Sequence, residues 1–455
     1  FSSQNKEEER MFEKMFKLKQ NNTTVKTEVV AGLTTFMTMA YILALNPAIL
    51  SASGMDPQAV LMATALAAFI GTIAMALLAN YPFALAPGLG LNAYFAYTVC
   101  GTMGYSWQVA LFAVFIEGLI FILLSLTNVR EAIFNAIPTQ LKKGVSVGIG
   151  LFVAFIGLQD AGIIVDGSTL VTVVDFTADF RTAGISALLA LIGLLLIGIL
   201  YVKKVKGSIL IGIVVTWVLG IICQLTGLYQ GASMLPQWSN FDLTAIGKTF
   251  GQCFNLSGQH INVLDFIVIM FAFLFVDIFD TLGTLIGVAN KANMLDKDGK
   301  LPRIKQALLA DAIATSAGAV LGTSTTTTFV ESSSGVAEGG RTGLSSIVTG
   351  VLFLLAIFLS PVFIAIPGFA IAPALVFVGF LMVSAVTEID FNNLTEAIPA
   401  YICLLCMPLM YSISDGIAFG VISYVVINVF CGKAKKITPL MYVLALLFVL
   451  KYIFL

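Results

Sequence analysis

Polar side chains interrupt one apolar stretch of the chain, "FLFVDIFDTLGTLIG", at residues 273–287. Asp277, Asp280, Thr281 and Thr284 have the i, i+3, i+4, i+7 spacing that places residues on one face of an α-helix. A charged carboxylate at the centre of a bilayer costs about 2.5–3.5 kcal/mol, and such acids usually mark a pathway, a proton relay or a binding cavity. The stripe therefore predicts a functional site. The alternative is a structural stripe that contacts another helix, and it applies more to Asp277 than to Asp280.

A second polar stretch, "TSTTTTFVESSSGVAEGGRTG" at residues 323–343, lies between two apolar runs and contains Glu331. Its counterpart, "FALAPGLGLNAYFAYTV" at residues 83–99, is broken by Pro87, Gly88 and Gly90. Irregular backbone at membrane depth survives only against protein or a water-filled cavity, because its N–H and C=O groups need partners. A pair of interrupted segments at matching positions is therefore a pointer to the substrate site of a transporter.

The composition of residues 323–343 predicts a strand followed by a short helix. "TTTTFVE" has the β-branched content of an extended strand. "SSSGVAEGG" can begin a half-helix with Ser332 or Ser333 as its N-cap. The positive end of that half-helix would face whatever binds near Glu331. The alternative is an ordinary loop outside the membrane.

Three further polar positions are ambiguous. Asp311 in "ALLADAIATSAG" and Glu117 in "AVFIEGLIF" are lone acids in apolar runs, and each can serve either an interhelical hydrogen bond or a function. Thr38, in the first apolar run "AGLTTFMTMAYILALNP", either lines the same cavity or packs against a neighbour.

The composition places the chain among polytopic membrane proteins. Of 455 residues, 58% are hydrophobic and only 11% are charged, where a soluble domain has about 25% charged residues. The net charge of −1 gives no indication of a nucleic-acid partner. With His260 as its one histidine, the sequence offers no histidine-based metal site. It also contains no phosphate-binding loop motif, so ATP is not the expected energy source, and we expect no cofactor.

Twelve apolar runs and the two interrupted segments give fourteen predicted membrane crossings. Lys and Arg then cluster on one side, which the positive-inside rule assigns to the cytoplasm, so both termini are expected there. The clusters lie before residue 28 and at residues 130–143, 203–206, 291–305 and 433–436. Residues 439–455 could form a further span, but a helix on the cytoplasmic interface is favoured.

The pattern also indicates an internal repeat, with chance similarity among apolar helices as the alternative. Residues 137–157 resemble residues 366–386, and in both a glycine (Gly150, Gly379) follows a proline by twelve positions. Two seven-span halves follow, and an odd number of spans per half makes the repeat inverted. The predicted divisions are a cytoplasmic segment 1–27, a first repeat 28–226, an extracytoplasmic connector 227–261, a second repeat 262–431 and a C-terminal helix 432–455.

Five stretches resemble the AzgA-like purine permeases of the nucleobase–ascorbate transporter superfamily. The resemblance covers the chain from about residue 28 to its end, and the stretches are "AGLTTFMTMAYILALNP", "ALAPGLGLNAYFAY", "VDIFDTLGTLIGVA", "GTSTTTTFVESSSGVAEGGRTGL" and "AIPAYICLLCMPLMYSISDGIAFG". It implies an all-α membrane protein of fourteen spans in two inverted repeats. It also implies a core of spans 1–4 and 8–11, a gate of spans 5–7 and 12–14, and a possible homodimer.

The resemblance further implies a base bound between the third and tenth spans by Asp280 and Glu331. The superfamily often has Glu where this chain has Asp280 and a polar or charged residue at Thr284. The expected function is uptake of adenine, guanine or hypoxanthine by proton symport, with sodium as the less favoured ion. An intramembrane enzyme is not expected. Aspartyl chemistry needs two apposed carboxylates, and Asp277 and Asp280 on one helix are badly placed to face each other.

The remaining site predictions concern contacts to a planar base. Backbone N–H groups near Ala86, Gly88 and Thr328 could serve its ring nitrogens, while Tyr94, Phe95 or Phe329 could stack on it. Asp280 or Asp277 is the expected proton carrier, with Asp311 as a further candidate. Transporters of the same fold for pyrimidines or inorganic anions, and a channel, are the alternatives.

Overall fold

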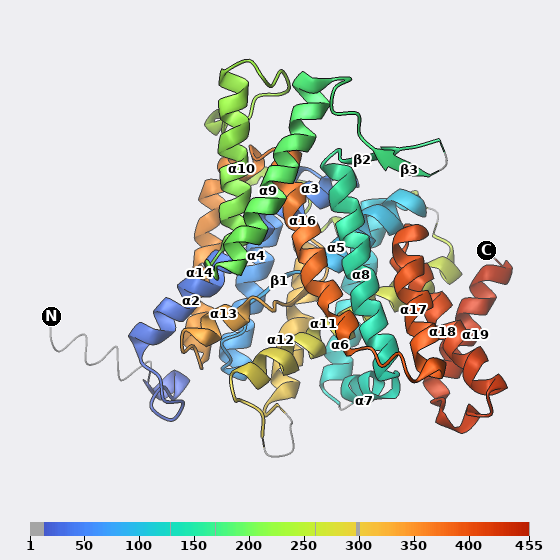
Figure 1. Ribbon diagram of the computed structural model, residues 1–455. Coiled ribbons are helices and arrows are strands. Elements are labelled where there is room, and N and C mark those ends of the chain that lie inside the picture. Colours follow the sequence, from blue (N-terminus) through green and yellow to red (C-terminus); the bar gives the residue numbers. More distant parts are fainter. Residues whose placement is uncertain (1–12, 128, 169, 260, 297–300, 455) are drawn as a thin grey trace.

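The computed structural model describes residues 13–127, 129–168, 170–259, 261–296 and 301–454 (Figure 1). The expectations for residues 1–12, His260 and residues 297–300 lie outside these ranges. The protein is a mostly helical membrane protein. In the described ranges, ten helical segments are long and apolar enough to cross a bilayer: Val25–Ser51, Pro57–Ala79, Trp107–Ser125, Thr139–Asp160, Phe180–Val202, Ser208–Leu225, Ile304–Leu321, Gly343–Ile364, Gly368–Glu388 and Ile413–Phe430.

Most helices in the first half of the chain are long and apolar, and side chains cap the starts of α2, α4 and α6. Asp56 accepts from the Ala59 N–H at the start of α4, and Ser106 accepts from the Val109 N–H at the start of α6. The elements are α2 (Val25–Met39), α3 (Ile42–Ser51), α4 (Pro57–Ala74), β1 (Leu85–Pro87), α5 (Leu89–Ala93), α6 (Trp107–Ser125), α7 (Val129–Ala136), α8 (Thr139–Asp160), β2 (Ile164–Asp166), β3 (Val171–Val173), α9 (Ile185–Val202) and α10 (Ser208–Leu225).

The second half repeats the pattern of long helices interrupted once by a strand. Its elements are α11 (Val263–Lys291), α12 (Ile304–Leu321), β4 (Thr326–Thr328), α13 (Ser332–Ala337), α14 (Gly343–Ala356), α15 (Ser360–Ile364), α16 (Gly368–Val383), α17 (Leu394–Leu409), α18 (Ile413–Phe430) and α19 (Pro439–Phe454). A helix, or a strand leading into a helix, thus lies at each of the fourteen predicted positions.

The two interrupted segments meet as a pair of antiparallel strands. Leu85, Ala86 and Pro87 of β1 lie opposite Thr328, Thr327 and Thr326 of β4, in that order. All six residues are buried, and the Gly88 N–H extends the ladder by donating to the Thr325 carbonyl at 3.0 Å. The predicted strand is therefore confirmed, and the alternative of an exposed loop is wrong because Thr323 to Thr328 have almost no exposed surface.

The predicted N-cap of the half-helix is wrong. Helix α13 begins at Ser332, and Glu331 occupies the N-cap position without a side-chain cap hydrogen bond. The Ser332 hydroxyl instead accepts from the Ala84 N–H at 2.9 Å. A tertiary contact to the strand segment has taken the side chain that the sequence pattern assigned to the helix end.

The two glycines of the internal repeat face each other where α8 and α16 cross. A Cβ on Gly150 would lie 2.8 Å from the Gly379 carbonyl oxygen, and a Cβ on Gly379 would lie 2.5 Å from the Gly150 carbonyl oxygen. Real Cβ atoms essentially never come so close to backbone, so the crossing depends on glycine at both positions. Equivalent positions of the two halves therefore meet at this crossing, as they do at β1 and β4.

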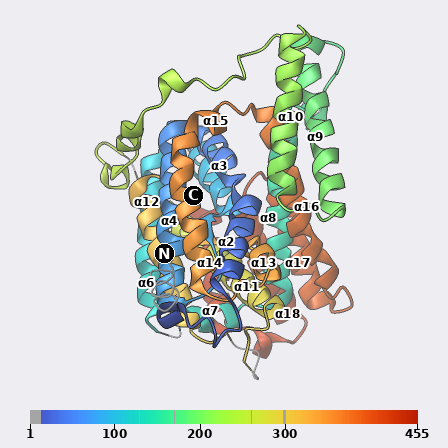
Figure 2. The same cartoon turned by 90° about the vertical axis from the view of Figure 1, so that its left-hand side faces the viewer.

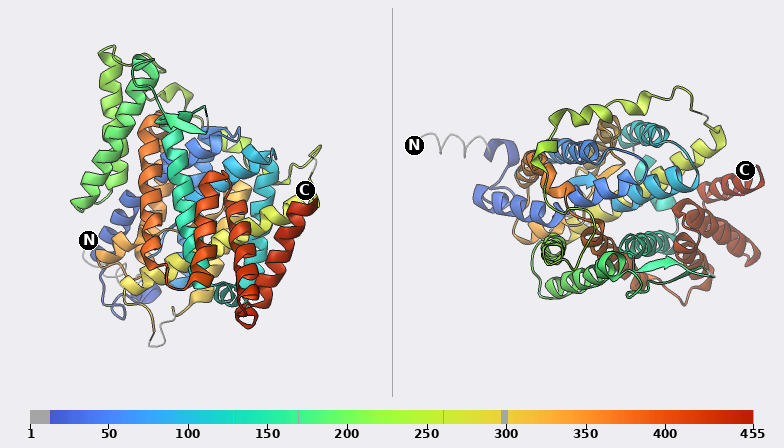
Figure 3. Two further views of the ribbon diagram at one scale, coloured as in Figure 1. Left: turned by 45° about the vertical axis from the view of Figure 1, so that its right-hand side comes forward. Right: turned by 90° about the horizontal axis from the view of Figure 1, so that it is seen from above.

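Helices α9 and α10 stand apart from the rest of the bundle and pack against α16 (Figure 2). The α7 helix and the α18–α19 turn lie at one end of the molecule, with the β2–β3 hairpin at the other (Figure 1). Helix α19 runs antiparallel alongside α18 (Figure 3). In agreement with this arrangement, Tyr452 near the end of α19 donates to Asp415 near the start of α18 at 2.5 Å. The predicted interfacial position of this helix stays a prediction.

Candidate functional site

A cavity of about 240 Å³ lies between α5, α8, α11 and the end of α16. Asp280 and Thr284 are the polar residues that α11 contributes to it. Its lining residues are Gly90, Lys142, Lys143, Val145, Ser146, Ile149, Val276, Asp280, Gly283, Thr284, Met382 and Ala385. The cavity is thus mostly apolar with a few polar groups, as is usual for a small-molecule site.

Asp280 lies against the paired strands. Its carboxylate accepts from the Thr327 hydroxyl, with an oxygen–oxygen distance of 3.3 Å, and Thr327 is the middle residue of β4. A Cβ on Gly88 would lie 3.0 Å from the Thr327 hydroxyl oxygen and 3.3 Å from an Asp280 carboxylate oxygen. The absence of a side chain at Gly88 therefore lets the strand end approach this carboxylate closely.

Glu331, four residues after Thr327, is held by Tyr41. The Tyr41 hydroxyl donates to a Glu331 carboxylate oxygen at 2.5 Å. Tyr41 lies at the break between α2 and α3, where the first span is interrupted. The sequence placed Tyr41 in the first apolar run but did not predict this partner, which is 290 positions away.

The other predicted binding residues fall into two groups. Ala86 and Thr328 lie in the paired strands beside Asp280, and the Phe329 N–H donates to the Ala84 carbonyl at 2.9 Å. Tyr94 and Thr38 are not among the residues that line the cavity beside Asp280. Tyr94 is fully buried with its ring edge-on to Phe273 at 4.9 Å, and the Thr38 hydroxyl donates to carbonyls of its own helix at 2.9 and 3.1 Å.

Asp277 points away from the cavity into a sealed ionic cluster. Arg130 of α7 donates to Asp311 of α12 at 2.8 Å and to Asp277 at 3.5 Å. Arg130 also donates to the Leu308 carbonyl at 3.2 Å, and its guanidinium lies 3.8 Å from the centre of the Phe121 ring. Arg130, Asp277 and Asp311 have no exposed surface. Among the ion pairs of the described residues, only these two have both side chains fully buried.

The predicted polar stripe therefore divides into two sites. Asp280 and Thr284 face the cavity, while Asp277 and Thr281 face Asp311 and Arg130. Sequence analysis missed Arg130 as a site residue because it counted the residue within a basic cluster at the membrane surface. A count of the acids within apolar runs could have indicated Arg130, because several buried acids need a buried cation as a partner.

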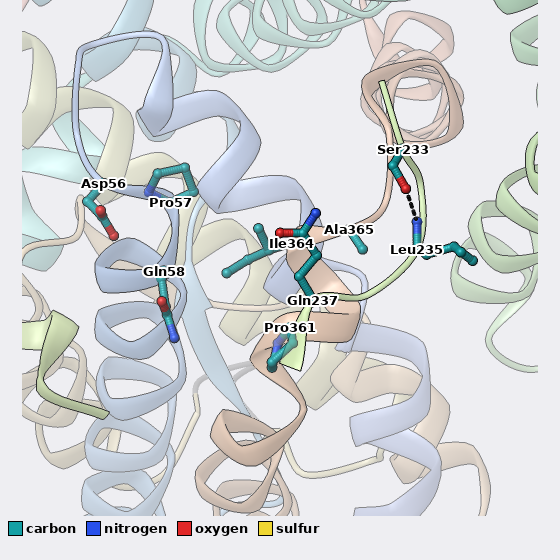
Figure 4. Close-up of a pocket in the computed structure, with 9 residues that line it drawn as sticks. All are labelled: Asp56, Pro57, Gln58, Ser233, Leu235, Gln237, Pro361, Ile364 and Ala365. Carbon is teal, nitrogen blue, oxygen red and sulfur yellow. Dashed lines mark hydrogen bonds between the residues drawn. The ribbon is translucent and has the colours of Figure 1, made fainter. Parts of the chain in front are cut away.

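A different cavity of about 290 Å³ lies where the start of α4, the segment after α10 and α15 approach one another (Figure 4). Asp56 is its only acid, and that carboxylate is occupied by capping α4 and by accepting from Lys248 at 2.6 Å. Asp280, by contrast, accepts a single hydrogen bond among the described residues, from the Thr327 hydroxyl, and so keeps acceptor capacity for a ligand. The cavity beside Asp280 is therefore the better candidate site.

A family model described as "Permease family" matches residues 26–419. The chain belongs to this permease family. It is accordingly a multi-pass membrane transporter and not an enzyme, and its resemblance to purine permeases is confirmed by relatives of nearly the same length.

Three such relatives span almost the whole chain. A putative permease of Methanocaldococcus jannaschii is 51% identical, with 97% of this chain and 98% of the relative covered. The adenine permease AdeP of Escherichia coli is 43% identical, with 98% and 96% covered. The guanine/hypoxanthine permease PbuO of Bacillus subtilis is 44% identical, with 95% and 98% covered. The last two identities are nearly equal, so overall identity does not choose between adenine and guanine.

The fold is also similar to that of solved transporters. The transmembrane domain of the cyanobacterial bicarbonate transporter BicA matches with a TM-score of 0.63 at 17% identity, covering 87% of this chain and 97% of that domain. At this identity the likeness concerns the fold alone.

Proposed function

We propose that the protein imports purine nucleobases (adenine, guanine or hypoxanthine) by proton symport with alternating access. The observation that carries the proposal is that Asp280 contacts the paired strands β1 and β4 beside a mostly apolar cavity. A purine offers N–H donors and ring-nitrogen acceptors in one plane. Carboxylates accept the former, and backbone N–H groups of the 85–92 and 325–331 segments that are not used in pairing the strands donate to the latter. The names of the adenine and guanine/hypoxanthine relatives support the same substrate class.

The proposed residue roles follow from position. Asp280 binds the base from the cavity side, with Thr284 beside it on the same face of α11. Glu331, fixed by Tyr41, contacts the base from the start of α13, where the helix dipole is positive. Ala86, Gly88, Thr328 and Phe329 form the wall of the site beside Asp280, where the Gly88 and Phe329 N–H groups are already used in pairing the strands. Tyr94 and Thr38 support the surrounding helices in this conformation and contact the base only if the helices rearrange.

The proposed architecture has fourteen crossings in two inverted repeats. Spans 1–4 and 8–11 form the core, spans 5–7 and 12–14 form the gate, and both termini are cytoplasmic in the cell membrane. The facing glycines of α8 and α16 and the antiparallel β1–β4 pair support the inverted repeat. A homodimer through the gate agrees with the separated position of α9 and α10, whose many large apolar side chains are exposed.

Proton coupling supplies the energy in this proposal. One proton moving down 100 mV provides about 2.3 kcal/mol, which is enough for about fiftyfold accumulation. Sodium is the less favoured coupling ion in this proposal.

An inorganic anion is the second candidate substrate, because the structurally similar BicA is a bicarbonate transporter. Asp280 opposes this candidate because it would repel an anion, whereas Lys142 and Lys143 in the same lining would attract one, so competition by sulfate decides between the two substrates. Anion carriers are expected to use cationic or dipole-only sites.

Uptake into proteoliposomes separates these possibilities. Labelled adenine, guanine and hypoxanthine are offered with and without a protonophore, and unlabelled purines, uracil and sulfate are added as competitors. The proposal predicts saturable purine uptake that purines inhibit, that uracil and sulfate leave unchanged, and that the protonophore lowers. Uptake blocked by sulfate or uracil instead would overturn it.

A further inference from the structure

The Thr281 hydroxyl lies between two carboxylates. Its oxygen is 2.8 Å from an Asp277 oxygen and 2.9 Å from an Asp311 oxygen. Both distances are those of good O–H···O hydrogen bonds. A threonine hydroxyl has one hydrogen to donate and two lone pairs to accept with. It can therefore donate to one carboxylate only, and the other contact needs a hydrogen from the second carboxyl group.

Sharing the single hydrogen between both carboxylates would bend both hydrogen bonds. It would also leave two like charges facing one hydroxyl in a site without exposed surface. One proton on the pair removes both problems. The hydrogen count thus indicates that a carboxyl group in this cluster is protonated.

Arg130 decides which carboxyl group holds the proton. Its guanidinium is 2.8 Å from Asp311 but 3.5 Å from Asp277. A charge-assisted hydrogen bond at the shorter distance stabilises the ionised form, so Asp311 is the carboxylate and Asp277 is the acid. The order of donation is then Asp277 to Thr281, and Thr281 to Asp311.

The surroundings agree with one bound proton. Arg130 and ionised Asp311 cancel, and protonated Asp277 adds no charge. The other acid nearby is Glu117 of α6, which accepts from the Thr325 hydroxyl at 2.7 Å. Asp280, on the cavity side of α11, bonds Thr327 instead. Loss of the proton would leave a net negative charge in a cluster sealed from water, which is unfavourable within a membrane.

We propose that Asp277, Thr281, Asp311 and Arg130 form a proton-binding site separate from the substrate cavity, in which Asp277 carries the proton, Thr281 relays it and Arg130 keeps Asp311 ionised. This inference rests on the proposed proton-coupled uptake and assigns its coupling ion to particular atoms. Asp311 accordingly acts as the counter-ion of Arg130 and not as a carrier. Thr281 and Arg130 are positioning residues, because they act through Asp277.

The test uses Asp277→Asn, whose amide resembles the protonated acid and can still donate to Thr281. The full-length protein is placed in proteoliposomes and assayed for two activities. Exchange of labelled for unlabelled purine needs no net proton movement and is expected within about threefold of wild type. Accumulation driven by a membrane potential of about 100 mV is expected to fall from about fiftyfold to no accumulation. Accumulation that persists in Asp277→Asn overturns the proposal.

A second set of variants covers the case in which Asp277→Asn does not fold. Thr281→Val keeps the side-chain shape but removes the relay hydroxyl, and it is expected to lower gradient-driven accumulation about tenfold. Thr281→Ser restores the hydroxyl and the accumulation. The matched control is Thr216→Val on α10, where a buried hydroxyl bonds only its own helix, at 2.7 Å from the Gly212 carbonyl. Equal accumulation by Thr281→Val and Thr216→Val contradicts the relay.

An infrared measurement reads the proton directly. Wild-type protein at neutral pH is expected to show the C=O stretching band of a protonated carboxyl group. The band is lost in Asp277→Asn and retained in Thr216→Val. If wild-type protein takes up no purine, the proposed function fails. If it accumulates purine but the band does not depend on Asp277, only the present inference fails.

Discussion

The two faces of α11 use the same residue type in opposite ways. Asp280 is half-buried, lines a cavity and has one hydrogen bond from Thr327 among the described residues. Asp277, three positions earlier, has no exposed surface and faces Thr281 and the Arg130–Asp311 pair. One carboxylate has spare acceptor capacity beside an open space, and the other has its capacity filled by protein.

The difference shows that the surroundings of a carboxylate, and not its position in the sequence, decide its role. A carboxylate with unused lone pairs beside a cavity can accept from a ligand. A carboxylate closed in by a hydroxyl and a guanidinium can exchange only a proton. In the proposed assignment, substrate and proton are bound about one helical turn apart on α11, so that movement of this helix would carry both.

Removing the cation from the sealed face should have the largest effect. Arg130→Gln leaves Asp277 and Asp311 buried without a counter-charge, and breaking a buried ion pair costs about 3–5 kcal/mol. We expect a large loss of folded protein in the membrane and a lower unfolding temperature, measured by thermal unfolding in detergent. The control is Lys436→Gln, which breaks a largely exposed pair with Glu396 at 3.0 Å. Equal stability of the two variants would contradict the sealed-cluster account.

Filling the space beside Asp280 should have the next largest effect. Gly88 has φ −75°, so Gly88→Ala causes no backbone strain. The added Cβ would press on Thr327 and Asp280 at 3.0 and 3.3 Å. A misplaced binding group commonly weakens the binding of both the substrate and the transition state. We therefore expect kcat/KM for purine uptake to fall about thirtyfold. Gly198→Ala, where a Cβ meets nothing within 4 Å, is the control. Unchanged kcat/KM in Gly88→Ala would place the substrate elsewhere.

Loosening Glu331 should have a moderate effect. Tyr41→Phe removes only the hydroxyl that donates to Glu331 at 2.5 Å. Hydrogen bonds to charged groups contribute about 1.5–3 kcal/mol, so purine affinity should weaken about tenfold or more. Equilibrium binding of labelled purine measures the change. Wild-type affinity in Tyr41→Phe would show that Glu331 is positioned without this hydrogen bond.

An ion pair distant from both faces should matter least. Burial alone would raise the pKa of Asp56, but hydrogen bonds from Lys248 and the Ala59 N–H lower that pKa below its usual value. A depressed pKa stabilises the fold at neutral pH, and this contribution disappears as the pH falls through the folded-state pKa.

Lys248→Gln should therefore cost less than about 1 kcal/mol at about pH 7, and the cost should be smaller at about pH 3, because protonation of Asp56 removes its interaction with Lys248. Unfolding temperatures of wild type and Lys248→Gln at the two pH values provide the measurement. A difference in unfolding temperature between the two proteins that becomes larger at the lower pH would contradict the predicted pH dependence.

The sequence predicted the elements of the site better than their partners. Helical spacing identified Asp277, Asp280, Thr281 and Thr284 as one stripe, and β-branched content identified the strand before Glu331. Both are local properties that three to seven residues decide. The division of the stripe into two sites was not predictable, because it depends on where α7 and α12 pack.

Partners far apart in the chain explain the remaining errors. Arg130 lies 147 positions from Asp277 and 181 positions from Asp311. Ser332 was assigned to a helix N-cap, but its hydroxyl bonds Ala84, which is 248 positions away. In each case a side chain with the right local chemistry found a stronger partner elsewhere in the fold.

The most direct test of the two-faced helix is equilibrium binding of labelled purine to purified Asp280→Asn and Asp277→Asn, measured side by side at neutral pH. Asp280→Asn should weaken binding about 100-fold, because a charge-assisted acceptor is lost from the cavity, while Asp277→Asn should bind within about threefold of wild type. Equal loss in both variants, or loss only in Asp277→Asn, would contradict the assignment of substrate and proton to opposite faces of α11.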